Sequence, residues 1–105
     1  MYAHKLDVLR GYCATVGRDF DPIVKTWQCE CVAIAPTAAA ASHLASASPF
    51  YAGAAASLVG TPAQVSAQIE GWAALGVSHM QIRFADFPRI GGIQLFMDEV
   101  MPHFA

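Results

Sequence analysis

The chain has 105 residues, of which 55% are apolar and 13% charged, and its six basic and eight acidic residues give a formal charge of −2. This length predicts a single domain over residues 1–105. Large closed barrels and doubly wound sheets, which house most cofactor enzymes, need more chain than this. The basic residues stand singly along the sequence, which argues against a nucleic-acid interface, because such an interface needs them clustered.

The stretch from Cys31 to Ile69 contains no Asp, Glu, Lys or Arg. Prolines 36, 49 and 62 cut it into pieces shorter than the ~20 residues that a membrane-spanning helix requires, so we expect no membrane partner. The first ten residues contain no apolar region of signal-peptide length, and a cytoplasmic location is therefore expected.

Three cysteines make an odd count, which disfavours a disulfide framework. Cys29 and Cys31 lie two residues apart in a predicted strand, so we expect their side chains side by side on one face, too far apart for an easy bridge. The usual spacing of zinc ligands is missing, and no metal site is predicted. The cysteines are interpreted as small buried thiols.

Apolar periodicity and turn residues outline the first half of the chain. Leu6, Leu9, Cys13 and Val16 share one helical face, which predicts a helix over residues 4–16. The β-branched and aromatic content of residues 23–35 indicates a strand. The Ala-rich residues 37–47 and then residues 50–59 are interpreted as short helical segments.

The second half begins with a stronger signal. Thr61 is suited to be an N-cap, Pro62 stands at the first helical position, and Gln64 completes a capping box. We expect this helix to end at Gly76. Residues 77–84 alternate between apolar and polar, which predicts a strand, and a final helix follows the loop that contains Gly91 and Gly92. Strands separated by helical crossovers pair in parallel, so the predicted fold class is α/β.

Five short pieces, spread over nearly the whole chain, carry a family resemblance through their order and spacing. They are Lys5-Leu6-Asp7-Val8-Leu9, Cys13 with Val16-Gly17-Arg18-Asp19, Gly60-Thr61-Pro62 with Gln64-Val65, Ala74-Leu75-Gly76-Val77, and Phe96 with Glu99-Val100-Met101-Pro102. In these pieces the chain resembles the carboxyl-terminal part of the luciferase-like monooxygenase superfamily, especially its deazaflavin-dependent oxidoreductases.

The resemblance implies a partial (β/α)₈ TIM barrel, made of the last two β/α units with the preceding helix. Residues 23–35 would be the seventh barrel strand, residues 77–84 the eighth, and residues 36–60 an insertion. The intact family member would use a deazaflavin (coenzyme F-420) or FMN. Because the upstream strands are missing, we expect no cofactor to bind to this chain alone, no catalytic residue within it, and no independent activity.

A barrel geometry would turn Met80, Ile82 and Phe84 toward the helices and His79, Gln81 and Arg83 into the lumen. Arg83 comes last of the three lumen-facing residues along the strand, so it would lie nearest the carboxyl-end face, where active sites of such barrels lie. Arg83, with Asp86 just beyond it, is therefore the candidate for contacting a cofactor or substrate edge. The alternative is a local ion pair between Arg83 and Asp86 that closes the loop.

The remaining candidates each have a structural alternative. Gly91 and Gly92 could present backbone N–H groups to a phosphate, or form a flexible loop before a helix. His79 could act as a general base, although a histidine satisfied by polar neighbours is the more common case. Phe50 and Tyr51 could cover a substrate mouth or pack in the core, and Trp27 and Trp72 are assigned to the core.

Two classes of function remain open. The first is an oxidoreductase portion that is not competent alone. The second is a structural or interaction module that oligomerises through exposed barrel edges, since unpaired strand edges invite pairing. A small-ligand binding module on the polar face of the last strand is a third possibility. The expected partner is a second copy of the chain or the remainder of the barrel.

Overall fold

Helices and strands alternate along the chain in the computed structural model, which describes residues 2–104. The elements are α1 (Tyr2–Val16), β1 (Lys25–Ile34), α2 (Ala38–Ala47), the 3-10 segment η1 (Ala54–Ala56), β2 (Ser57–Gly60), α3 (Pro62–Ala74), β3 (Val77–Phe84), α4 (Gly91–Glu99) and the 3-10 segment η2 (Met101–His103). The predicted α/β class is confirmed.

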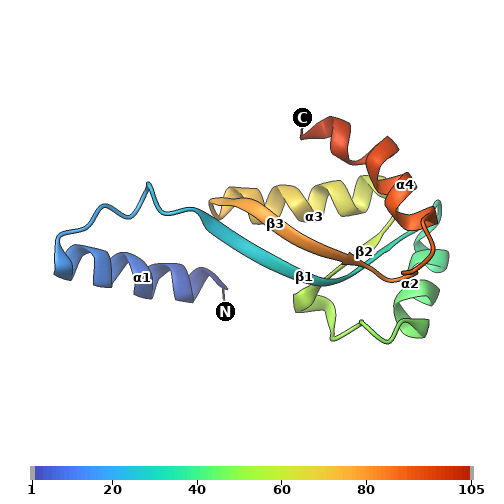
Figure 1. Cartoon of the computed structure of the whole chain (residues 1–105), viewed down its shortest axis with the longest axis horizontal. Coiled ribbons are helices and arrows are strands. Elements are labelled where there is room, and N and C mark those ends of the chain that lie inside the picture. The colour runs from blue at the N-terminus through green and yellow to red at the C-terminus, as the bar shows by residue number, and fades with distance from the viewer. Residues whose placement is uncertain (1, 105) are drawn as a thin grey trace.

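The three strands form one parallel sheet in the order β2-β1-β3 (Figure 1). β3 pairs along most of β1. β2 pairs only with the last four residues of β1, Cys31 to Ile34. Strands that follow one another in a closed (β/α)₈ barrel are neighbours. Here β2 and β3 lie on opposite sides of β1, so residues 2–104 form a small open α/β sheet and not a closed barrel.

The strand β2 corrects the sequence analysis, which predicted helix over residues 50–59. The last four residues of β1 are buried, and their backbone N–H and C=O groups need partners away from water. Ser57–Gly60 supplies them, and Leu58 becomes part of the core with 1% of its surface exposed. Tertiary pairing thus outweighs the helix propensity of the preceding alanines.

Each face of the sheet has its own apolar core. α3 and α4 cover one face, where the buried residues include Trp27, Val32, Leu58 and Val65. On the other face α2 packs its alanines against the carboxyl half of β1. Figure 1 shows the sheet between these two layers. The assignment of Trp27 to the core is confirmed, and its ring stacks on Trp72 at a centroid distance of 4.1 Å.

A β-bulge in β1 changes which way its side chains point. The register with β3 shifts between Cys29 and Val32, so Cys29 joins the core under α3 and Cys31 joins the core beside α2. The expectation that the two thiols share one face is therefore wrong, because the bulge inserts an extra residue into the alternation. All three cysteines are buried and free, as the sequence analysis predicts.

The start of α3 forms as predicted. The Thr61 hydroxyl accepts a hydrogen bond from Gln64 N at 3.3 Å, and Gln64 Oε1 accepts one from Thr61 N at 3.0 Å. Gly60 precedes this cap with φ +149°, and a Cβ there would lie 2.6 Å from Gln64 Oε1. The capping box therefore depends on glycine at position 60 as well as on its own two residues.

Helix α1 lies beside the extended start of β1 and projects away from the other helices (Figure 1). Its apolar stripe is only partly used, because Cys13 is buried whereas Leu9, Tyr12 and Val16 are exposed. At its amino end the Tyr2 hydroxyl donates to Thr26 O at 2.7 Å, and the Tyr2 ring meets Trp72 edge-on. Among residues 2–104, no helix combines the length and apolar character needed to cross a membrane.

Candidate functional site

Polar side chains line one face of the β1–β3 pair. The register sets Thr26 opposite His79 and Gln28 opposite Gln81, and Met80, Ile82 and Phe84 point the other way, toward the helices. This orientation of β3 is the one that the sequence analysis expected. His79 is exposed on this face, as are Gln28 and Gln81. The polar face ends at the carboxyl edge of the sheet, where Arg83 meets Glu30.

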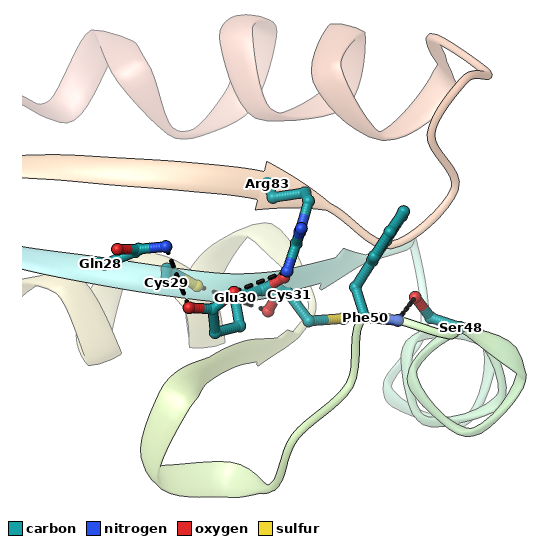
Figure 2. A network of polar contacts seen from close by, with 7 residues as sticks. All are labelled: Gln28, Cys29, Glu30, Cys31, Ser48, Phe50 and Arg83. Carbon is teal, nitrogen blue, oxygen red and sulfur yellow. Dashed lines mark hydrogen bonds and ion pairs between the residues drawn. The ribbon is translucent and has the colours of Figure 1, made fainter.

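Arg83 is held by two contacts to one residue (Figure 2). Its Nη2 lies 2.6 Å from Glu30 Oε2, and its Nε donates to Glu30 O at 3.1 Å. Gln28 Nε2 donates to the other carboxylate oxygen, Oε1, at 3.0 Å. The guanidinium also lies over the Phe50 ring, 4.4 Å from its centroid. A half-exposed cation is thus fixed in one orientation by a carboxylate, a carbonyl and an aromatic face.

Asp86 lies apart from this network, and the predicted alternative of an Arg83–Asp86 ion pair is wrong. Its Oδ2 accepts a hydrogen bond from Gly92 N at 2.9 Å, in the first turn of α4. Unsatisfied N–H groups and the helix dipole attract a carboxylate to this position. A Cβ on Gly92 would lie 2.8 Å from Asp86 Oδ1, so glycine is required there for the contact.

The helix starts that could hold a cofactor phosphate are partly occupied by the chain's own oxygens. A phosphate site at a helix start needs backbone N–H groups that are not already bonded. The chain's own oxygens cap α2, α3 and α4: Thr37 binds Ala40 N, Thr61 binds Gln64 N, and Asp86 binds Gly92 N. At the carboxyl edge of the sheet, Arg83 is already paired with Glu30.

Two of the three buried cysteines, Cys29 and Cys31, have thiols whose protonated form is favoured by burial. Burial raises the pKa of the Cys29 thiol to about 11, and its Sγ donates to Cys31 O at 3.4 Å. Burial also raises the pKa of Cys31, which points toward the loop of Ser48 and Phe50 (Figure 2). Protonated thiols are poor nucleophiles and poor metal ligands. Within residues 2–104, no three His, Cys, Asp or Glu side chains are grouped to hold a metal ion.

An apolar hollow of about 490 Å³ adjoins the guanidinium of Arg83. Its lining combines three aromatic rings with aliphatic side chains: Phe50, Ile82, Phe84, Phe87 and Ile93, together with Arg83 itself. Phe50 also packs against the core beside α2, while Tyr51 is exposed. Apolar walls with one charged group are typical of small-molecule sites. The hollow and the Glu30–Arg83 pair together form the candidate site.

Sequence reasoning found Arg83 and missed its partner. Glu30 and Arg83 are 53 positions apart, so no local spacing connects them. The usable signal was their common place near the carboxyl ends of two strands predicted to be parallel neighbours, since such ends meet at one edge of a sheet.

No family model and no curated protein matches this chain. Among solved structures, it is similar to the crystal structure of monooxygenase RslO1 from Streptomyces bottropensis, with a TM-score of 0.57 and 20% sequence identity. The superposition covers 98% of this chain and 38% of that chain. At this identity the likeness shows the fold alone, and the chain spans well under half the length of that monooxygenase.

Proposed function

We propose that the chain is the carboxyl-terminal part of a luciferase-like, flavin- or deazaflavin-dependent monooxygenase. One observation carries the proposal: a solved monooxygenase structure superposes on 98% of the chain with a TM-score of 0.57. In a (β/α)₈ barrel substrates bind at the carboxyl ends of the strands, and Glu30–Arg83 lies at the carboxyl edge of this sheet, which supports the proposal. The sequence resemblance supports the same branch, the deazaflavin-dependent oxidoreductases.

In this role the chain supplies part of the substrate cavity and leaves the redox cofactor to other segments. Arg83 and Glu30 form a positioned polar pair, and the rings of Phe50, Phe84 and Phe87 line the apolar hollow beside it. Because the chain spans 38% of the monooxygenase it is similar to, most of a cofactor site would come from other segments, and the isolated chain is proposed to bind no flavin and to have no activity.

The test measures the molecular mass of the native polypeptide and its absorbance spectrum. An antibody raised against residues 2–16 should detect a polypeptide well above 11.2 kDa in the source cells, and the purified polypeptide should show flavin or deazaflavin absorbance. The isolated chain should show no saturable binding when FMN or coenzyme F-420 is titrated and its fluorescence followed. A native polypeptide of 11.2 kDa would contradict the proposal, and so would sub-micromolar cofactor binding by the isolated chain.

A second candidate function is an interaction module that associates through a sheet edge. The observation that favours it is the outer edge of β3, an eight-residue strand that pairs with β1 on one side only within the described chain. Detection of the native protein at 11.2 kDa, as an assembly of identical chains, would support this candidate over the first.

A further inference from the structure

The two outer strands of the sheet differ in what bonds their outward-facing backbone groups. At the β2 edge the Gln68 carboxamide bonds both backbone groups of Val59, accepting from Val59 N at 3.2 Å and donating to Val59 O at 2.8 Å. A side-chain amide here takes the place of a further strand. At the β3 edge, no strand among residues 2–104 pairs with the outer side. Exposed edges of this length pair readily with another strand.

The backbone groups that face outward on β3 follow from strand alternation. Ala85 N donates to Val32 O at 2.9 Å, so odd-numbered positions at this end of β3 direct their N–H and C=O toward β1. Met80, Ile82 and Phe84 therefore direct theirs outward. An antiparallel partner would meet a regular series of donors and acceptors at these positions.

An apolar groove of about 630 Å³ runs beside this edge, on the helical side of the sheet. Met80 and Ile82 of β3 form part of its lining, together with Ile69 of α3 and residues of α4 and the carboxyl-terminal segment. Met97, Met101 and Phe104 are 55%, 51% and 44% exposed there. Exposed apolar side chains gathered in one groove are typical of a protein–protein contact.

We propose that the outer edge of β3 pairs antiparallel with β3 of a second copy of this chain, with Gln81 on the two-fold axis. The six strands then form one continuous sheet, and the axis runs perpendicular to it. Such an axis brings the α3–α4 layers of both copies to the same side of the sheet. The exposed methionines and Phe104 of each copy then meet those of the other.

The second copy is the favoured occupant because the edge is complementary to itself in this register. Met80 of one copy lies opposite Ile82 of the other on the helical face, and Gln81 lies opposite Gln81 on the polar face. His79 lies opposite Arg83, whose charge is already balanced by Glu30 of its own chain. β3 contains no Asp or Glu, so the pairing brings no two carboxylates together.

The area available is that of a weak, reversible dimer. Eight residues of strand are about 26 Å long, and a sheet layer with one helical layer is about 20 Å high, so each copy contributes about 500 Å². The total of about 1,000 Å² reaches the lower bound for specific interfaces. This inference rests on the second function proposed above and deepens it by naming the edge and the partner.

Sedimentation equilibrium of the full chain, from on the order of 1 μM to 500 μM, tests the proposal by measuring the mass and the dissociation constant. The wild type should form a dimer. Gln81→Lys and Gln81→Glu should each weaken that dimer by about fivefold or more, because like charges then face each other across the axis. Mixing the two variants should restore association as a heterodimer. Gln81 is exposed, so both changes should leave the monomer fold intact, and circular dichroism of each variant checks this.

The matched control is Thr26→Lys, an exposed position on the central strand, which should leave the dissociation constant unchanged. A wild type that stays monomeric over the whole range overturns the proposal. So does a dimer that both Gln81 variants leave intact, or a mixture of the two that fails to associate. A luciferase-like native polypeptide would contradict the second function by its mass, without affecting these measurements on the 105-residue chain.

Discussion

Gln68 and Val59 form a closed pair across the β2 edge, in which one carboxamide bonds both the N–H and the C=O of one strand residue. β2 has only four residues, and its other side is taken up by β1. Without Gln68, the outward backbone groups of Val59 would face the partly covered space next to α3. The side chain therefore fixes α3 to the sheet and also blocks that edge from adding strands.

Gln68→Ala is expected to lower the free energy of unfolding by about 1 to 2 kcal/mol, because two half-buried backbone groups lose their partners. Urea denaturation followed by circular dichroism measures this loss. Gln94→Ala, an exposed position of α4, is the control and should change the free energy by less than about 0.5 kcal/mol. Equal effects of the two substitutions would show that the Gln68 contact does not stabilise the edge.

Local chemistry in the sequence predicted the parts of the fold that depend on neighbouring residues. The start of α3 at Thr61 and Pro62 follows from capping, and β3 follows from its alternation. β2 could not be predicted this way, because four residues after an alanine run have no periodicity of their own. They become a strand only because the carboxyl half of β1 needs a partner.

The candidate site was predicted only in part, for a related reason. Arg83 is predicted from its place at the end of β3. Its partner Glu30 lies on β1, which neighbours β3 in the sheet but is far from it in sequence and carries a bulge. Simple alternation along β1 is broken by this bulge, so the faces of Cys29 and Cys31 were assigned wrongly. Asp86 was linked to Arg83 by sequence proximity, whereas the start of α4 offers it an unsatisfied N–H.

Thr61→Ala is expected to destabilise the chain by about 1 kcal/mol, since the hydroxyl accepts the Gln64 N–H that otherwise has no partner. Thr61→Ser keeps the oxygen and should retain most of the stability. Thermal and urea denaturation of the three proteins provide the comparison. If alanine and serine behave alike, the cap does not contribute to stability.

Asp86 and Gly92 should be energetically coupled. Gly92→Ala places a Cβ 2.8 Å from Asp86 Oδ1 and should cost about 1 to 3 kcal/mol through the clash and the displaced hydrogen bond. In the Asp86→Ala background the same glycine substitution should cost much less, because the carboxylate is gone. A double-mutant cycle by urea denaturation measures the coupling, and additive effects would contradict the contact.

Arg83→Met should remove the contact with Glu30 at little cost to stability, within about 1 kcal/mol, because the pair is substantially exposed. The change should instead be local, at the carboxyl edge of the sheet. Amide chemical shifts of Glu30 and Phe50 should move in nuclear magnetic resonance spectra, while those of α3 stay in place. A loss of several kcal/mol would show that the pair is a major structural element.

Stability should fall in alkaline solution through Cys29. Its pKa rises from an ordinary value of 9.0 to about 11 in the folded chain because burial disfavours the thiolate. Below pH 9 the thiol is protonated in both states, so its contribution is fully present. Between pH 9 and pH 11 the unfolded chain loses this proton and the folded chain keeps it, which favours unfolding as the pH rises. Cys29→Ala removes the group, so the unfolding free energy of this variant should fall less steeply over this window than that of the wild type. Urea denaturation at pH 8, 9, 10 and 11 gives the two slopes, and identical slopes would mean that the Cys29 thiol is not held in the apolar core beneath α3.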